Sequence, residues 1–161
     1  MFLVFACFND FKLFQMDVKS AFLNGFIDQE VFVEQSPGFE NKNLPNYVFK
    51  LSKALYGLKQ VPRVWYERLS SFLIEMDLKV VDTTLFTQTD LNDLLVVQIY
   101  VDDIIFGATN DSLCKDFSHL MQKEFEMSMM GKLQFFLGLQ VHQTKEATFI
   151  SQIKYTKELL K

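Results

Sequence analysis

The chain has 161 residues, of which 49% are hydrophobic and 22% charged, and its formal net charge is −4. This length is enough for one domain with a hydrophobic core and is short for two independent ones. No apolar run approaches the ~20 residues that a membrane-spanning helix needs. The apolar residues 1–8 lack a basic leader and a small-residue cleavage site, so a signal peptide is not expected.

The two cysteines, Cys7 and Cys114, have no C-x-x-C partner. This pattern suits a reducing compartment and offers no zinc site. Both are expected to be small core residues.

A net charge of −4 argues against simple electrostatic capture of nucleic acid. Residues 50–68 nevertheless form a local basic stretch with aromatic residues between the charges; its cations are Lys50, Lys53, Lys59, Arg63 and Arg68, against the single acid Glu67. Such a stretch can follow a phosphate backbone, although a solvated helix face is its more common meaning. Both interpretations stay open from the residues alone.

The first elements in chain order are short and extended. Residues 1–8 are expected to form a buried strand or the end of a helix. Residues 11–17 predict a strand that ends in a carboxylate, and residues 31–34 a second short strand. Ser36-Pro37-Gly38 ends it, and residues 41–46 form a turn-rich loop.

The middle of the chain predicts a helix followed by a hairpin. Pro62 suits a first helical turn, and an amphipathic stripe of about four turns follows it; the stripe is Trp65, Leu69, Phe72, Leu73 and Met76. Two apolar runs, residues 94–101 and 104–106, flank Asp102-Asp103. We expect a β-hairpin with the two acids at its tip.

The last third predicts a helix, a strand pair and the start of another helix. Asn110 begins a good N-cap cluster, and the apolar spacing after it predicts a helix that ends near Gly131. Residues 135–141 and 149–151 are expected to pair as strands, and residues 154–161 to begin a helix. The whole order predicts an α+β fold with helices packed on one face of an antiparallel sheet.

The acids at these positions suggest phosphoryl-transfer chemistry. Two divalent ions ~3.5–4 Å apart can stabilise both the attacking and the leaving oxygen of an in-line displacement, and magnesium prefers oxygen ligands. A strand-end Asp17 beside Asp102-Asp103 would supply three carboxylates from two elements. Acids are also ordinary at turns, so each one alone indicates little. The strongly apolar flanks of Asp102-Asp103 argue against a solubilising role.

Three segments carry a resemblance to a known family. They are Gln15-Met16-Asp17-Val18-Lys19-Ser20-Ala21-Phe22-Leu23-Asn24-Gly25, Leu55-Tyr56-Gly57-Leu58-Lys59-Gln60-Val61-Pro62-Arg63-Val64-Trp65-Tyr66 and Tyr100-Val101-Asp102-Asp103. In this order they resemble the motifs of the reverse transcriptase of copia-type LTR retrotransposons. The resemblance covers residues 11–160, and the three motifs together are far more specific than Tyr100-Val101-Asp102-Asp103 alone.

The resemblance implies a site around the acids. Asp17 becomes the first metal ligand, with the Val18 carbonyl assisting, and Asp102 the second. Asp103 completes the acidic pair with a looser hold on metal. The implied ion is Mg²⁺, with Mn²⁺ as an alternative. Phe22 falls where the family has an aromatic gate beneath the incoming sugar; without the motif it would be read as a core aromatic.

The resemblance also implies contacts with substrates. Tyr56, Gly57 and Lys59 are expected near the templating base and the incoming nucleotide, with Gly57 allowing close backbone approach. The residues expected to contact nucleic acid are Arg63, Tyr100, Leu137 and Gly138, the last two in a strand turn that grips the primer end. Trp65 is expected in the core. His142 is expected at the surface, without a catalytic role.

Residues 1–161 are expected to be a single partial domain, the polymerase palm core. The N-terminal fingers region, the thumb-like region, the connection and RNase H of the family have no counterpart here, which suggests a fragment of a polyprotein. Val61 replaces the more common alanine of the second motif. Asp77 stands where the family has glycine, which puts that turn in question.

The function implied is RNA-directed DNA polymerisation in the cytoplasmic virus-like particle of the element. Its partners would be an RNA template, a DNA primer, dNTPs and the rest of the Pol polyprotein, with no membrane. One alternative is a folded but inactive remnant of a decayed element. Another is an RRM-like nucleic-acid binding module, which would use aromatic and basic residues on its central strands. Residues 94–101 are instead mostly aliphatic and lead into two acids.

Overall fold

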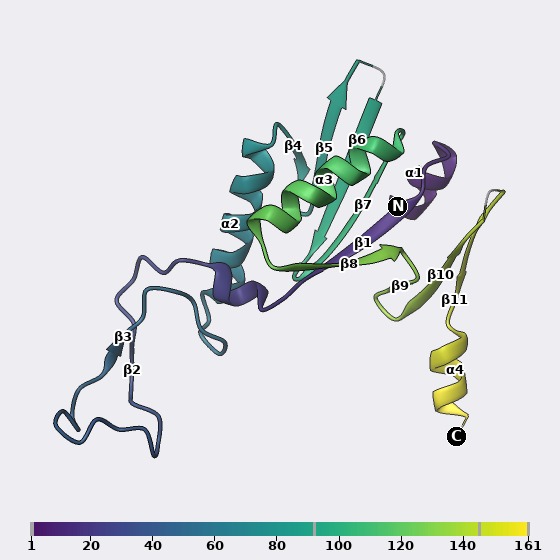
Figure 1. The fold of residues 1–161 in the computed structure, drawn as a ribbon. Helices are drawn as coiled ribbons and strands as arrows, with labels where there is room; N and C mark the ends of the chain where they lie inside the picture. Colours follow the sequence, from purple (N-terminus) through teal and green to yellow (C-terminus); the bar gives the residue numbers. More distant parts are fainter. Residues whose placement is uncertain (1, 92, 145, 161) are drawn as a thin grey trace. The chain divides into compact units, whose positions relative to one another are not determined.

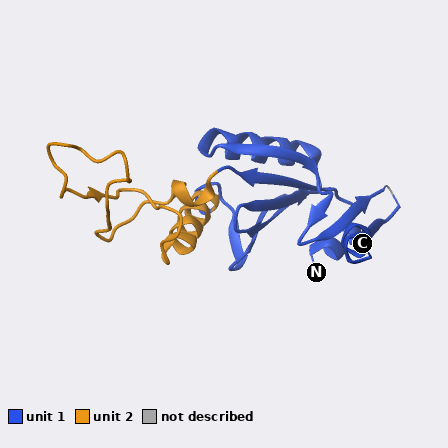
Figure 2. Ribbon diagram, turned by 90° about the horizontal axis from the view of Figure 1, so that it is seen from below, with its two compact units in different colours: residues 1–19, 74–161 blue, residues 20–73 orange. Residues whose placement is uncertain are grey.

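The computed structural model describes residues 2–91, 93–144 and 146–160 of the chain. It divides into two compact units, one of residues 1–19 and 74–161 and the other of residues 20–73 (Figure 2). The boundary at residues 73–74 falls inside a helix, α2 (Val61–Glu75). The single partial domain expected from the sequence stays a prediction.

The larger unit is built on an antiparallel sheet of six strands in the order β4-β5-β6-β7-β1-β8 (Figure 1). The strands are β1 (Leu13–Val18), β4 (Lys79–Asp82), β5 (Leu85–Asp90), β6 (Asp93–Tyr100), β7 (Asp103–Ala108) and β8 (Met127–Lys132). A smaller sheet has the order β11-β10-β9, formed by β9 (Phe135–Phe136), β10 (Leu139–Gln143) and β11 (Thr148–Ser151). Every hydrogen-bonded strand pair in the two sheets is antiparallel, and helix α3 (Asp111–Glu124) connects β7 to β8 on either side of β1. The α+β class with an antiparallel sheet is confirmed.

The two faces of the large sheet are covered by different elements. Helix α3 (Asp111–Glu124) packs on the face that carries Phe106, whose ring lies 4.9 Å from that of Phe117. The opposite face carries Leu13 and Ile105, which form an apolar cluster with Ala6 of helix α1 (Phe2–Phe8). Because successive strand residues point to opposite faces, every second residue of β1 and β7 lies on the same face as Leu13 and Ile105.

The smaller sheet joins the large one through a side-chain amide. Gln143, the last residue of β10, accepts from the backbone N–H of Leu13 at 2.8 Å through Oε1. Its Nε2 donates to the carbonyls of Leu13 and Leu133, at 3.0 and 3.2 Å. The amide of Gln143 therefore occupies the place of a strand residue beside β1.

The second unit contains the short helix η1 (Ala21–Asn24), the strand pair β2 (Phe32–Val33) and β3 (Phe49–Lys50), and most of α2. The apolar stripe predicted for α2 is confirmed, with Trp65, Leu69 and Leu73 buried. Gly25, which ends the first motif, lies against this helix. A Cβ at Gly25 would come within 2.7 Å of Val64 Cγ1, so the motif needs glycine for close packing.

Several expectations for the elements are wrong. α3 ends at Glu124, and residues 127–131, which were expected to continue it, belong to β8 instead. The sequence reasoning missed β4 and β5. Residues 135–141 are divided by a turn into β9 and β10, and only the pairing of β10 with β11 matches the expected strand pair.

The ends of the larger unit also differ in part from expectation. α1 is a helix, but it buries Ala6 alone and leaves Phe8 88% exposed. Cys114 is buried as expected, whereas Cys7 is exposed. The final helix, α4 (Ile153–Leu159), is present. None of the helices described is long and apolar enough to span a membrane.

The turn after α2 forms with Asp77 in the left-handed region, at φ 63°. Its N–H donates to the Ile74 carbonyl at 3.0 Å, as expected for the end of a helix. Glycine is the usual residue at such a position because a Cβ there costs about 1 kcal/mol. The expected glycine is therefore replaced without loss of the turn, at a cost in backbone strain.

Asp77→Gly is expected to raise the free energy of unfolding by about 0.5–1 kcal/mol, because glycine relieves this strain. Urea denaturation of the 161-residue chain measures the change. Asp77→Ala is the matched control: it removes the same charge but keeps the Cβ, so it should give no stabilisation. Equal stabilisation by both variants would assign the effect to charge instead of backbone conformation.

Candidate functional site

The predicted hairpin is present, and its tip is a two-residue turn. Tyr100 pairs with Asp103, so Val101 and Asp102 make the connection between β6 and β7. Val101 has φ 58°, which a β-branched residue rarely adopts. Backbone strain of this kind costs of order 1–3 kcal/mol and gathers at functional sites. The sequence reasoning missed Val101, although a valine in a two-residue hairpin turn was the available signal.

The register of the sheet brings the acids to one end of it. β1 pairs with β7 so that Asp17 lies opposite Asp103, and directly opposed residues share a face. The Val18 N–H donates to the Asp102 carbonyl at 3.0 Å, which fixes the turn against the end of β1. Asp17 and Asp103 thus lie on the face opposite α3.

The charges at this end act on one another. Partial burial raises the pKa of the Asp17 carboxyl above its ordinary 3.8, and the negative charges of Asp102 and Asp103 raise it further. Among the residues that the structure describes, no three or more His, Cys, Asp or Glu side chains gather closely enough to hold a metal ion. The donor set still fits magnesium in chemistry, since carboxylate oxygens are its ligands and a dication would relieve the repulsion on Asp17.

The raised pKa of Asp17 has a consequence for stability. Because the folded chain binds this proton more readily than the unfolded chain, ionised Asp17 costs stability above its folded pKa, and the cost disappears below 3.8. Asp17→Asn is therefore expected to raise the Tm at pH 7, with an advantage that shrinks as the pH falls toward 3.8. Calorimetry across pH 3–8 measures this. Asp116→Asn, at an exposed helix position, is the control and should show no such pH-dependent gain.

Gln15, two residues before Asp17, is a further residue of this site that the sequence reasoning did not single out. Its Nε2 donates to Asp103 Oδ1 at 2.7 Å. Gln15 lies opposite Ile105 on β7, on the same face as Asp17 and Asp103. The first motif contains it, so its position was the signal.

In the second unit, two of the residues expected to bind nucleotide meet each other. The rings of Phe22 and Tyr56 lie 5.3 Å apart and are inclined by 54°. Phe22 is half-buried and Tyr56 exposed. Gly57 has φ 96°, a conformation that favours glycine.

The basic stretch of this unit is exposed and partly paired. Arg63 Nε lies 2.8 Å from Glu67 Oε1, one helical turn away. Lys50 pairs with Glu30, and Lys53 Nζ lies 5.6 Å from the centre of the Phe26 ring. Lys59 is exposed. A solvated surface accounts for these contacts, and a phosphate partner for Lys59 and Arg63 stays a prediction.

The residues expected to grip a primer form the turn between β9 and β10. Leu137 and Gly138 both have positive φ, 49° and 78°, and line a hollow of about 430 Å³ with Lys154, Tyr155 and Glu158 of α4. Phe136, just before the turn, contacts Tyr100 edge to face with ring centres 6.0 Å apart. The turn is thus linked by a ring contact to the residue that precedes Val101. His142 is exposed, as expected.

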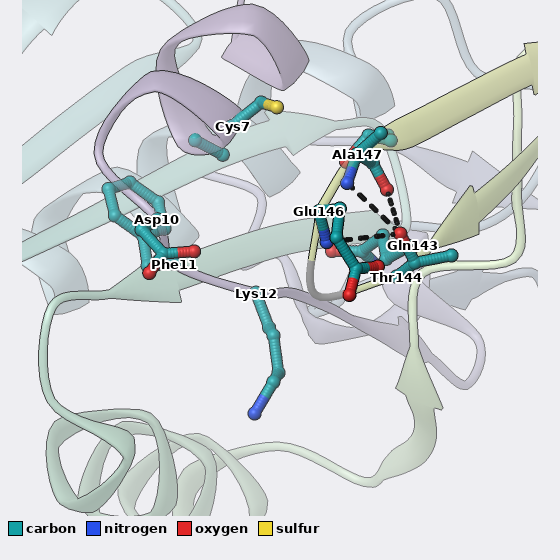
Figure 3. Close-up of a pocket in the computed structure, with 10 residues that line it drawn as sticks. Cys7, Asp10, Phe11, Lys12, Gln143, Thr144, Glu146 and Ala147 are labelled. Atoms are coloured by element: carbon teal, nitrogen blue, oxygen red, sulfur yellow. Dashed lines mark hydrogen bonds between the residues drawn. The ribbon is translucent and has the colours of Figure 1, made fainter.

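Another hollow, of about 300 Å³, lies between the end of α1 and the turn from β10 to β11 (Figure 3). Its polar lining includes Asp10, Lys12, Thr144 and Glu146. The residues described around it include none of those predicted to act in catalysis or binding. It is separate from the acidic end of the sheet.

Comparison with known proteins gives the family. Residues 1–161 match the family described as reverse transcriptase (RNA-dependent DNA polymerase). The chain is 36% identical over 91% of its length to the retrovirus-related Pol polyprotein from transposon RE2 of Arabidopsis thaliana, and 34% identical over 94% to that from transposon TNT 1-94 of Nicotiana tabacum. It spans only 10% and 12% of these two polyproteins. No solved structure matches the chain. The resemblance drawn from the three motifs is confirmed, and the chain belongs to the reverse transcriptase (RNA-dependent DNA polymerase) family of copia-type retrotransposon Pol polyproteins.

Proposed function

We propose that this chain is the palm segment of an RNA-directed DNA polymerase, and that Asp17, Asp102 and Asp103 carry its nucleotidyl transfer. The observation that carries the proposal is the β1–β7 register, which sets Asp17 opposite Asp103 beside the turn that holds Asp102. Separate elements, about 85 residues apart in the chain, deliver these acids to one end of the sheet. Family membership supports the same chemistry.

Asp17 and Asp102 would hold Mg²⁺, with the Val18 carbonyl assisting and Asp103 binding the metal more loosely. Mn²⁺ would be accepted at the same oxygens. Bound metal would supply charge neutralisation for the attacking and leaving oxygens of the transfer. The work of the protein is positioning. The backbone hydrogen bond from the Val18 N–H to the Asp102 carbonyl and the tight turn at Val101 hold the carboxylates at a rigid end of the sheet. The carboxylates then need little rearrangement during the reaction.

The remaining substrates would be an RNA template, a DNA primer and dNTPs, used within a Pol polyprotein in the cytoplasmic particle of the element. Phe22, supported by Tyr56, would lie beneath the incoming sugar, with Gly57 and Lys59 near the nucleotide. Arg63, Tyr100, Leu137 and Gly138 would contact the nucleic acid. The exposed turn at Leu137 and its contact through Phe136 with Tyr100 support a primer end close to the acids.

Primer extension tests the proposal. The matched segment of the RE2 polyprotein is replaced by this chain, and the chimera is compared with the 161-residue chain alone on an RNA template with dNTPs and Mg²⁺ or Mn²⁺. We expect extension by the chimera and little by the chain alone, because catalysis also needs cations that neutralise the triphosphate and surface that holds the duplex.

Robust extension by the isolated chain would show that the palm segment is sufficient. Extension by neither protein, while the unmodified RE2 polyprotein is active, would overturn the proposal and favour an inactive remnant of a decayed element. The binding-module alternative predicts salt-sensitive RNA binding without any nucleotide addition. Filter binding over a salt series separates these two outcomes.

A further inference from the structure

The three acids do not have the same surroundings. Asp103 receives a hydrogen bond of 2.7 Å from Gln15 Nε2 in a partly buried setting, whereas Asp17 lies beside the turn that carries Asp102. A hydrogen bond to a charged acceptor is short and stronger than a neutral one. The amide therefore fixes one carboxylate oxygen of Asp103 toward the middle of β1.

The sheet register allows this contact. Gln15 lies opposite Ile105 of β7, and Asp103 lies two residues before Ile105 on the same face. The amide of Gln15 therefore reaches Asp103 diagonally across the β1–β7 pair. On the other side of β1, Gln15 lies opposite Gly131 of β8, where the register shifts between Gln15 and Met16.

We infer that Gln15 is a positioning residue that holds the Asp103 carboxylate away from Asp17 and Asp102, and so leaves those two acids as the metal-binding pair. This inference rests on the proposed function. It accounts for the looser hold on metal expected of Asp103 and for three carboxylates that share one end of the sheet without converging.

The link itself is tested in the metal-free 161-residue chain by a double-mutant cycle of Gln15→Met and Asp103→Ala. Methionine keeps the length of the side chain but has no donor. We expect Gln15→Met to lower the Tm by roughly 5 °C when Asp103 is present, and by clearly less in the Asp103→Ala background. Gln98→Met is the matched control, since Gln98 lies on the same face on β6 and should show equal losses in both backgrounds.

The division of the acids is tested by Mn²⁺ binding to the same variants, followed by electron paramagnetic resonance. Without the amide, Asp103 becomes available as an added ligand, so Gln15→Met is expected to tighten binding by about threefold or more. This gain should vanish in the Asp103→Ala background. Unchanged or weaker binding in Gln15→Met, or a gain that persists without Asp103, would overturn the inference.

Failure of the Gln15 role and failure of the metal site give different results. If every variant binds Mn²⁺ but the Tm cycle shows no coupling, the role of Gln15 is wrong and the proposed metal site stands. If the coupling is present but no variant binds Mn²⁺, the metal part of the proposed function fails, and the division of the acids fails with it.

Discussion

Asp102→Asn in the chimera is expected to lower the rate of nucleotide addition by about a thousandfold, equivalent to ~4 kcal/mol of transition-state stabilisation. The change removes a charged oxygen from the proposed metal-binding pair while keeping the size of the side chain. The loss should appear in kcat, because the carboxylate is proposed to act on the transferring phosphate and not on template binding. Single-turnover primer extension measures it.

The fold should survive this substitution. Asp102 lies in an exposed turn whose backbone bond to Val18 does not involve the side chain, and removing a negative charge relieves the repulsion on Asp17. The Tm of the 161-residue chain is therefore expected to stay equal or rise. Asp90→Asn is the control, since Asp90 pairs with Asp93 at the other end of β6. A chimera that keeps full activity after Asp102→Asn would remove Asp102 from the mechanism.

The position of the acids could be predicted because the signals are local. An apolar strand that ends in Asp17, and two apolar runs around Asp102-Asp103, each define an element by composition over a few residues. The hairpin then follows from the short connection. Pairing of β1 with β7, which brings the two elements together, could not be predicted from periodicity, because strand order is a long-range property.

The missed elements show where local signals fail. β4 and β5 carry polar and charged residues on a hairpin whose strands are mostly exposed, so their alternation is weak. The residues of β8 include three methionines, which suit helices as well as strands, and the helical spacing of α3 was extended through them. Phe125, with extended backbone dihedrals at the end of α3, stops the helix without any glycine or proline to signal it.

The candidate site shows the same limit. Gln15 lies inside the first motif, yet its role depends on which residue of β7 lies within reach of its side chain. The register between β1 and β7 decides this. Gly131 looked like the end of a helix and instead belongs to the bulged strand beside Gln15. Glycine marks both helix ends and bulges, so its residue type alone could not decide between them.

Phe22→Val in the chimera is expected to raise the efficiency of ribonucleotide relative to deoxyribonucleotide incorporation by between about tenfold and a hundredfold. The proposed discrimination is steric: the Phe22 ring would collide with a ribose 2′ hydroxyl, and valine is too short to do so. The Phe22 ring contacts the ring of Tyr56, with 5.3 Å between their centres, and this contact supports its position. Competitive extension with matched rNTP and dNTP pairs measures the ratio, which is insensitive to the fraction of active protein.

A purely structural role for Phe22 makes a different prediction. As a half-buried aromatic it would lose packing on conversion to valine, at a cost of ~1–2 kcal/mol in the free energy of unfolding, and the selectivity ratio would not move. Phe39→Val is the control, because Phe39 is 86% exposed in the same unit and should change neither quantity. Stability and selectivity measured on the same three proteins therefore separate the two roles. A lower Tm with an unchanged ratio of ribonucleotide to deoxyribonucleotide incorporation would show that Phe22 is a packing residue only. A raised ratio would identify Phe22 as the residue that selects the sugar.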